Sequence, residues 1–354
     1  MLSVGLDLHK RYSQVEALEE SGERRAAARL VNEFEQIEGF FRALGEPCRV
    51  VLEAGWNWGA MFDWLERVEN VVEVQLAHPY GVRAIAAAQV KTDRIDARML
   101  GQLLRVGLIP RAHIPGKQTR QLREAVRQRL FLVRLRTMVK NRIHVRLARY
   151  HVTPPPVSDL FGKRGRDYLG KVELPGCAQD LLRQDLRLLQ LFGVEVREAE
   201  TLLARTLKGD RRVELLRTIP GLGALLATVV ALEIDRIDRF VSPAKLVAYA
   251  GLVPTTYSSG GKTSHGGLMK MSNKWLRWAL VEAAWIAVRH DPYFRHQFGL
   301  RYRSKGPKTA IIAVARRLAE VVWHVLAEDR NYEVRQPASK RREYGLTPAA
   351  LPQD

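Results

Sequence analysis

The sequence predicts an α/β domain at the N-terminal end, followed by a long helical segment and a mainly α-helical C-terminal part. Strand and helix signals alternate over residues 1–110, whereas the later residues give largely helical patterns. The charge balance changes at about the same place. Residues 1–116 contain 14 of the 57 Lys and Arg residues and 16 of the 38 Asp and Glu residues, so the rest of the chain carries the excess positive charge. A chain of 354 residues is long enough for more than one hydrophobic core.

Five short apolar runs predict the strands of the first domain. They lie at residues 2–8, 12–18, 25–31, 48–53 and 71–76. The second and third are joined by the turn-rich residues 20–23 and form a hairpin. Apolar side chains at helical spacing predict helices over 34–44 and 61–68, and a third helix begins near Thr92, a suitable N-cap. This β-β-β-α-β-α-β-α order implies a mixed sheet with helices on its faces.

The rest of the chain divides into three further segments. We expect the α/β domain to cover residues 1–112, a basic helical linker 113–210, a C-terminal domain 211–328 and a flexible tail 329–354. Within the linker, residues 117–150 form one long amphipathic helix, and a Pro/Gly-rich loop separates it from a second helix. We expect the two helices to pair as a coiled coil.

The first linker helix carries eleven basic residues and a single acid, Glu124. A solvated helix face usually mixes both signs of charge, so this bias favours contact with the phosphates of an RNA duplex or an RNA–DNA hybrid. Dimerisation through the apolar stripe of the same helix is an alternative role, and both can hold. The residues assigned to phosphate contact are Arg123, Arg127, Arg134, Lys140 and Arg146.

Four acids in the first hundred residues predict a metal site. Asp7 lies in the strand 2–8 and Glu53 ends the strand 48–53, while Asp93 and Asp96 are three residues apart at the start of a helix. Carboxylates at two strand ends and on one helix face can surround a divalent cation, which offsets their cost inside a fold. Mg²⁺ or Mn²⁺ held in this way indicates phosphodiester chemistry.

Three residues near these acids are given structural roles. His9 is interpreted as a structural or solvent-facing histidine. Trp56 and Trp58 have rings that can stack on bases, but packing against the sheet is the favoured interpretation.

Two glycine-containing segments mark the C-terminal domain. Gly221 and Gly223 precede a helix and resemble a helix-hairpin-helix turn, in which backbone N–H groups approach a phosphate. An ordinary glycine turn before a core helix is the alternative. Residues 251–267 are expected to form a loop of small and hydroxyl-bearing residues that leads into a helix.

This loop contains the candidate nucleophile. The sequence offers Ser258 and Ser259, and a serine beside a glycine can bring its Oγ close to a phosphorus atom. A flexible Ser/Gly turn is the alternative. Basic side chains that can stabilise the developing charge follow closely. They are Lys262, His265, Lys270 and Arg277.

These motifs, in this order, closely resemble the DEDD transposases of bacterial insertion sequences, also called bridge-RNA-guided recombinases. The resemblance spans roughly residues 1–330. The matching segments in the first half are Gly5-Leu6-Asp7, Leu52-Glu53-Ala54-Gly55 and the run from Lys91 to Arg98. In the second half they are Ile219-Pro220-Gly221-Leu222-Gly223, Ala250-Gly251-Leu252-Val253-Pro254, Ser259-Gly260 and Leu276-Arg277.

The resemblance implies a RuvC/RNase H-like fold for the first domain and a transposase domain for the second half. It implies that the four acids Asp7, Glu53, Asp93 and Asp96 bind metal and that Ser259, which abuts a glycine, is the nucleophile. It further implies a bridge RNA that pairs with donor and target DNA, and a homo-oligomer between a dimer and a tetramer.

The function expected from these features is that of an insertion-sequence transposase, which cuts and rejoins DNA through a phosphoserine intermediate. A RuvC-like junction nuclease without a covalent intermediate is one alternative, and a nucleic-acid-binding protein without activity is another. With two cysteines, no signal peptide and no apolar stretch of membrane-spanning length, we expect a cytoplasmic, nucleoid-associated bacterial protein without membrane contact.

Overall fold

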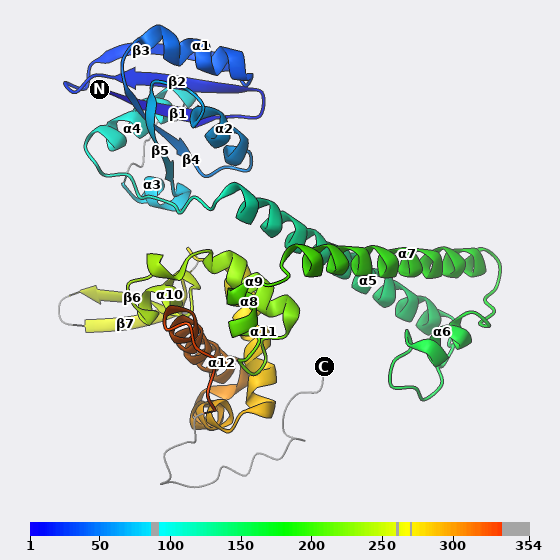
Figure 1. Ribbon diagram of the computed structural model, residues 1–354. Helices are drawn as coiled ribbons and strands as arrows, with labels where there is room; N and C mark the ends of the chain where they lie inside the picture. The colour runs from blue at the N-terminus through cyan, green and yellow to red at the C-terminus, as the bar shows by residue number, and fades with distance from the viewer. Residues whose placement is uncertain (86–91, 260–261, 270, 335–354) are drawn as a thin grey trace. The chain divides into compact units, whose positions relative to one another are not determined.

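The chain forms two compact units in the computed structural model, residues Met1–Pro115 and a second unit that begins at Gly116 (Figure 1). The structure describes residues 1–85, 92–259, 262–269 and 271–334. The first unit is an α/β domain and the second is mainly helical, which confirms the predicted fold class at this level. Each unit is described separately below.

The first unit contains a five-stranded mixed sheet in the order β3-β2-β1-β4-β5. Strand β1 pairs antiparallel with β2 and parallel with β4, which in turn pairs parallel with β5. This arrangement agrees with the RuvC/RNase H-like fold that the resemblance implies. The strands are β1 (Leu2–Leu8), β2 (Tyr12–Leu18), β3 (Arg24–Val31), β4 (Cys48–Glu53) and β5 (Val71–Ala77).

Helices cover both faces of this sheet (Figure 1). On one face, α1 (Phe34–Leu44) and α2 (Trp58–Leu65) bury residues such as Phe41 and Met61 against the sheet. On the other face, α4 (Asp93–Arg105) packs on β1, β2 and β4. A short helix that the sequence pattern did not predict, α3 (Pro79–Ile85), follows β5.

Helix α4 approaches β1 unusually closely at Gly5. A Cβ atom built on Gly5 would lie 1.9 Å from the carbonyl oxygen of Ala97 and 2.5 Å from the backbone nitrogen of Gly101. Only glycine leaves room for two backbones at this separation. The contact fixes where α4 begins relative to the end of β1, because Ala97 lies one turn after Asp93.

The second unit opens with two long helices that pack along each other, α5 (Lys117–Arg149) and α7 (Cys177–Thr206), with α6 (Lys163–Leu169) at their far end (Figure 1). We call this pair with α6 the helical arm. Its apolar seam includes Ile143 and Leu182, both fully buried. The carboxylate of Asp185 is only 1% exposed and accepts a 2.8 Å hydrogen bond from Arg146 Nη2.

The remaining helices surround a large apolar core. They are α8 (Arg211–Leu216), α9 (Ala224–Ile234), the 3-10 turn η1 (Ile237–Arg239), α10 (Pro243–Tyr249), α11 (Lys274–His290) and α12 (Pro292–Ala327). Helix α12 is kinked at Gly306, whose φ of 75° is non-helical, just before Pro307. Residues expected to form a loop instead form a hairpin, β6 (Pro254–Ser259) paired with β7 (Lys262–Leu268).

The glycines of the predicted helix-hairpin-helix turn have different surroundings. A Cβ atom on Gly221, where φ is 92°, would lie 2.2 Å from the carbonyl oxygen of Ala283 in α11. Glycine is therefore required at this position for packing on α11. This contact is what the alternative, an ordinary glycine turn before a core helix, would show. Gly223 is the N-cap of α9 and would have open space around a Cβ.

We predict that Gly5→Ala lowers the free energy of unfolding by about 2 kcal/mol, because the added methyl group must push α4 away from β1. Thermal denaturation of the purified variant measures this effect. The matched control is Gly39→Ala in α1, where a Cβ meets nothing within 4 Å. This exposed helical glycine should instead give a gain of up to about 1 kcal/mol, and equal effects of the two changes would contradict the close contact.

Candidate active site

Asp7 and Glu53 lie at the same edge of the sheet, on the face that α4 covers. Strands β1 and β4 are parallel and in register at Leu6 and Leu52, so the next residue of each strand is one of the two acids. Gly5 and Val51, two residues earlier, both face α4. Because side chains alternate along a strand, Asp7 and Glu53 belong to this same face.

The other two acids arrive from the first turn of α4. The hydroxyl of Thr92 accepts a hydrogen bond of 3.3 Å from the backbone N–H of Ile95, which confirms Thr92 as the N-cap. Asp93 and Asp96 follow immediately, at the end of α4 where the helix dipole favours negative charge. Asp96 and Asp93 are both close enough to Asp7 to act on it electrostatically.

His9 lies between two of these carboxylates, and its side chain is 36% exposed, so it faces both solvent and the acid cluster. Its Nε2 atom is 2.9 Å from Asp7 Oδ2 and 3.2 Å from Asp93 Oδ2. The sequence held a usable signal, because Asp7 and His9 are two residues apart and strand periodicity places such residues on one face.

Polar side chains hold this cluster in place from outside. The Tyr12 hydroxyl donates a 2.9 Å hydrogen bond to Asp93 Oδ2, and the Tyr12 ring stacks on His9 with centroids 4.7 Å apart. The Nδ2 groups of Asn32 and Asn57 both donate to the carbonyl oxygen of His9, at 2.8 and 3.0 Å. Such partners fix the orientation of an imidazole or carboxylate that binds a ligand.

Negative charge is concentrated here in a partly buried place. Burial raises the pKa of Asp7, the nearby His9 opposes this rise, and the charges of Asp96 and Asp93 add to it. The hydrogen bond to Asp93 likewise raises the pKa of the Tyr12 phenol. A cation that entered the cluster would offset the repulsion between the carboxylates.

The donor atoms fit a divalent metal ion. One ligand atom each of Asp7, His9 and Asp93 lies within 4.8 Å of the others, a spacing that a single ion can span. Carboxylate oxygens are the ligands that Mg²⁺ and Mn²⁺ prefer, and imidazole is compatible with Mn²⁺. Asp96 and Glu53 lie on the same side of the sheet and extend the acidic surroundings.

The candidate nucleophile lies at the tip of the β6–β7 hairpin. Ser259 is the last residue of β6, and its backbone pairs with that of Lys262. The side chains of Ser259, Lys262 and His265, and the whole of Lys270, lie outside the part of the chain that the structure describes. Ser258, one residue earlier, is exposed.

Arg277 anchors the base of this hairpin instead of lying open to solvent. Its guanidinium donates 3.1 and 2.5 Å hydrogen bonds to the carbonyl oxygens of Ala250 and Met269, and another to the hydroxyl of Ser272. Gly251 lies against the same group, since a Cβ there would be 2.1 Å from Arg277 Nη2. Burial lowers the pKa of Arg277. Arg277 therefore positions the hairpin, and the phosphate contact expected for it stays a prediction.

Several cations of α5 are likewise held by internal carboxylates. Arg123 donates to the carbonyl oxygens of Leu232 and Glu233 at the end of α9. Arg127 forms a 2.8 Å ion pair with Glu233, whose side chain is only 5% exposed, and the Glu233 carboxylate also accepts from Asn273. These contacts, and the ion pair of Arg146 described above, give structural roles to three of the five residues that the sequence assigned to phosphate contact.

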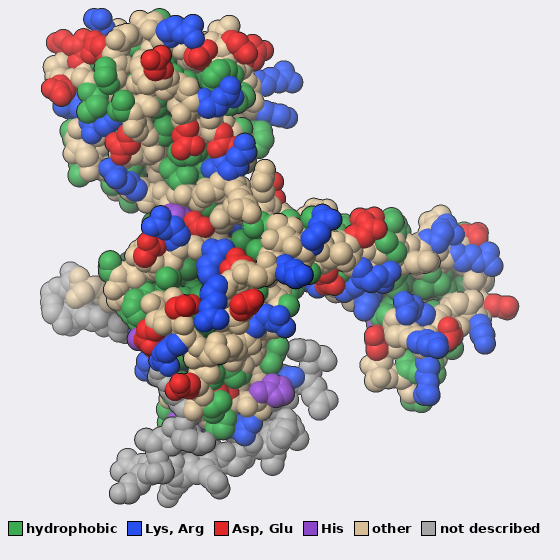
Figure 2. Space-filling model, in the orientation of Figure 1, with side chains coloured by type: hydrophobic (Ala, Val, Ile, Leu, Met, Phe, Trp, Pro, Cys, Tyr) green, Lys and Arg blue, Asp and Glu red, His purple; other side chains and the backbone are tan. Residues whose placement is uncertain are grey.

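The other two residues assigned to phosphate contact, Arg134 and Lys140, have more open surroundings. Arg134 is exposed, and the Lys140 ammonium lies 4.8 Å from the centre of the Phe161 ring. Figure 2 shows Lys and Arg side chains along the helical arm and around α6, with some Asp and Glu side chains among them. The arm thus presents a basic surface even though part of its charge is internally paired.

The two tryptophans differ. Trp58 packs on the sheet core and contacts Phe62 with ring centroids 6.2 Å apart, as expected. Trp56 is 75% exposed, so the expectation that it packs against the sheet is wrong. It follows β4 in the Ala54–Asn57 turn, three residues after Glu53, where a helix has not yet begun and the chain is turned toward solvent.

Two family models match the chain. One, described as a DEDD transposase, covers residues 4–152, and the other, described as the transposase IS116/IS110/IS902 family, covers residues 213–298. No helix among the described residues combines the length and apolar character that crossing a membrane requires.

Curated relatives agree with both matches. A probable family 20 transposase of Pseudomonas aeruginosa is 26% identical over 93% of this chain and 98% of its own length. The transposase for insertion sequence element IS1328 of Yersinia enterocolitica is 27% identical over 92% and 96%. The transposase for IS1111A of Coxiella burnetii is 26% identical over 74% and 73%.

The metal-compatible acid cluster, the family matches at both ends and the full-length relatives point to one family. The chain belongs to the DEDD transposases of bacterial insertion sequences, enzymes that cut and rejoin DNA.

Proposed function

We propose that this transposase joins DNA through a phosphoserine intermediate and is guided by a bridge RNA. The acid cluster around Asp7 carries the proposal, because it gathers ligands for a divalent metal beside a helix N-terminus that favours anions. Mg²⁺ is the preferred ion, held by Asp7, Glu53, Asp93 and Asp96, with His9 as an additional ligand. When bound, such an ion neutralises charge on a DNA phosphate.

The protein residues then have defined tasks. Ser259 Oγ attacks the scissile phosphorus, so that a serine–phosphate bond forms and the bond from phosphorus to the deoxyribose oxygen breaks. The serine proton passes to that leaving oxygen, which becomes a free hydroxyl end. Reversal by a hydroxyl of the exchanged strand restores the phosphodiester, and the bond energy is conserved in the covalent intermediate.

The transposase relatives support this reaction over the junction-nuclease alternative, whose attacking group is water. Arg277 supports the serine step by holding both ends of the β6–β7 hairpin to α11. Anchoring the base of the hairpin limits where its tip residues can lie, which suits the positioning of a nucleophile.

We predict that Asp7→Asn reduces Mg²⁺-dependent DNA cleavage by roughly a thousandfold, because one ligand charge is lost at the centre of the cluster. Calorimetric titration with Mn²⁺ should show weaker metal binding by the same variant. Glu35→Gln, an exposed acid of α1 in the same unit, is the matched control and should change neither quantity. Full cleavage by the Asp7 variant would contradict the metal role.

We predict that Ser259→Ala abolishes a covalent protein–DNA adduct, whereas Ser258→Ala leaves it. Denaturing gels of the purified enzyme with labelled DNA detect such an adduct directly. The two serines are adjacent in β6, so the two single substitutions distinguish them. An adduct that survives both substitutions would require another nucleophile.

The helical arm supports the RNA part of the proposal. Its exposed basic side chains follow a straight pair of helices, a shape suited to the backbone of a nucleic-acid duplex. Trp56 adds an exposed ring beside the acid cluster on which an unpaired base can stack. Target choice would then reside in the pairing of the RNA, not in side chains of the protein.

Exposed apolar residues on α5 support a homo-oligomer between a dimer and a tetramer. Phe131, Met138 and Val145 are all more than half exposed and repeat every seven residues, so they form a single stripe along the helix. Apolar side chains arranged in this way are typical of a helix face that packs on another helix. A second copy of the arm is the partner we propose.

We predict that Arg134→Ala weakens binding of RNA transcribed from beside the gene and lowers the steepness of its salt dependence. Loss of one phosphate contact should reduce the slope of log affinity against log salt by about 0.9 for a duplex. Filter binding at several salt concentrations measures it. Arg42→Ala, an exposed arginine of α1 paired with Glu38, is the control and should leave the slope unchanged.

A further inference from the structure

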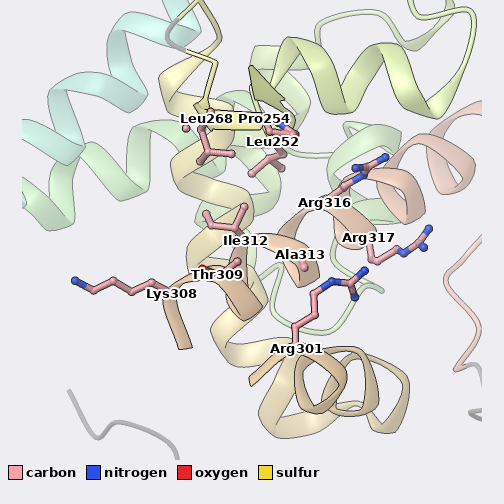
Figure 3. Close-up of a pocket in the computed structure, with 12 residues that line it drawn as sticks. Leu252, Pro254, Leu268, Arg301, Lys308, Thr309, Ile312, Ala313, Arg316 and Arg317 are labelled. Atoms are coloured by element: carbon pink, nitrogen blue, oxygen red, sulfur yellow. The ribbon is translucent and has the colours of Figure 1, made fainter. Parts of the chain in front are cut away.

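A cavity of about 640 Å³ lies between the base of the β6–β7 hairpin and helix α12. Leu252, Pro254 and Leu268 form one wall, and Ile312 faces them from α12 (Figure 3). This volume falls within the range of about 300–1,000 Å³ that is usual for ligand sites. The cavity is independent of the acid cluster, which belongs to the first unit.

Cations surround this apolar wall. Arg301 and Arg317 lie on one side in Figure 3, and Lys308 extends on the other. Arg317 forms a 2.7 Å ion pair with Glu320. Among the residues that the structure describes, neither Arg301 nor Lys308 has an acidic partner, and both are exposed. The kink at Gly306 separates these two cations along α12.

An apolar surface with uncompensated cations on two sides matches one nucleotide of an unpaired strand. Each nucleotide of such a strand presents a flat, weakly polar base flanked by two phosphates. A purely apolar ligand would leave both cations unused, and an acidic peptide would leave the apolar wall uncovered. None of the twelve lining residues is aromatic, so base contact here would be by van der Waals packing and tolerant of base identity.

We propose that this cavity binds one unpaired DNA nucleotide of the strand that Ser259 attacks. The inference rests on the proposed function of Ser259. Strand β6 runs from Pro254, in the cavity wall, to Ser259, and its five steps of about 3.4 Å separate the two by roughly 17 Å. The bound nucleotide therefore lies a few nucleotides from the scissile phosphate in the same strand and holds that strand against the hairpin.

Ala313 offers a direct way to fill the cavity. It lines the cavity from α12, as Ile312 does (Figure 3). Ala313→Leu therefore adds volume inside the cavity without removing a charge, and leucine suits a helix. It complements the charge variants Arg301→Ala and Lys308→Ala.

The experiment uses the full chain and a labelled oligothymidylate that carries photoreactive 5-iodouracil. We expect crosslinked peptides that contain Leu268 or Ile312, and loss of these crosslinks in Ala313→Leu. Arg301→Ala and Lys308→Ala should each weaken binding by roughly tenfold and reduce the salt slope by about 0.7. Lys305→Ala, an exposed lysine of α12 outside the cavity lining, is the matched control and should behave like the parent protein.

Two results would overturn the inference. One is crosslinking confined to other segments, and the other is binding of the oligonucleotide by Ala313→Leu as tightly as by the parent protein. Measuring the Ser259-dependent adduct in parallel separates the two proposals. Unchanged adduct without cavity crosslinks removes this inference alone, whereas cavity crosslinks without any adduct remove the phosphoserine reaction and keep the nucleotide site.

Discussion

The contact between α4 and β1 at Gly5 is the constraint on which the acid cluster depends. Two backbones meet there at a distance that excludes even a methyl group. Since α4 crosses the sheet at this point, its first turn must lie beside the carboxyl end of β1. Asp93 and Asp96 are thus delivered to Asp7 by packing, and the cluster requires no long loop to assemble it.

A helix N-terminus offsets part of the electrostatic repulsion between the carboxylates that meet there. The backbone N–H groups of the first turn of α4 and the Thr92 cap favour negative charge there. His9 adds a group between Asp7 and Asp93 at hydrogen-bonding distance from both. The site is therefore held in shape by the protein itself, with Tyr12, Asn32 and Asn57 as its outer supports. Such preorganisation is what a metal site needs for a fixed ligand geometry.

The sequence predicted the first unit in detail because its signals are local. Strand alternation, helical spacing and the Thr92 cap each depend on neighbours in the chain, and all correspond to observed elements. The β6–β7 hairpin was expected to be a loop, because its strands are rich in Ser, Thr and Gly, which score poorly as strand formers. Its structure depends on Arg277 and α11, which local patterns do not report.

Side-chain roles were harder to predict than elements, since they depend on which residues meet in space. The guanidinium groups of Arg123 and Arg277 bind carbonyl oxygens inside the protein, although their positions in the chain suited phosphate contact equally well. Trp56 is the converse case, since an aromatic residue beside a buried strand proved exposed. Only the tertiary contacts separate a structural cation or ring from one available to a ligand.

The positive charge of the second unit is also divided between internal contacts and exposed side chains. Buried carboxylates such as Asp185 and Glu233 each form ion pairs with more than one arginine, so part of the positive charge of α5 serves to join helices. A buried carboxylate left without these guanidinium partners would be costly, so these arginines have a structural role. Cations outside these ion pairs include the exposed Arg134 of the arm, and Arg301 and Lys308 beside the cavity. Net charge alone therefore overstates how much positive charge lacks an internal partner, because part of it joins the helices of this unit to one another.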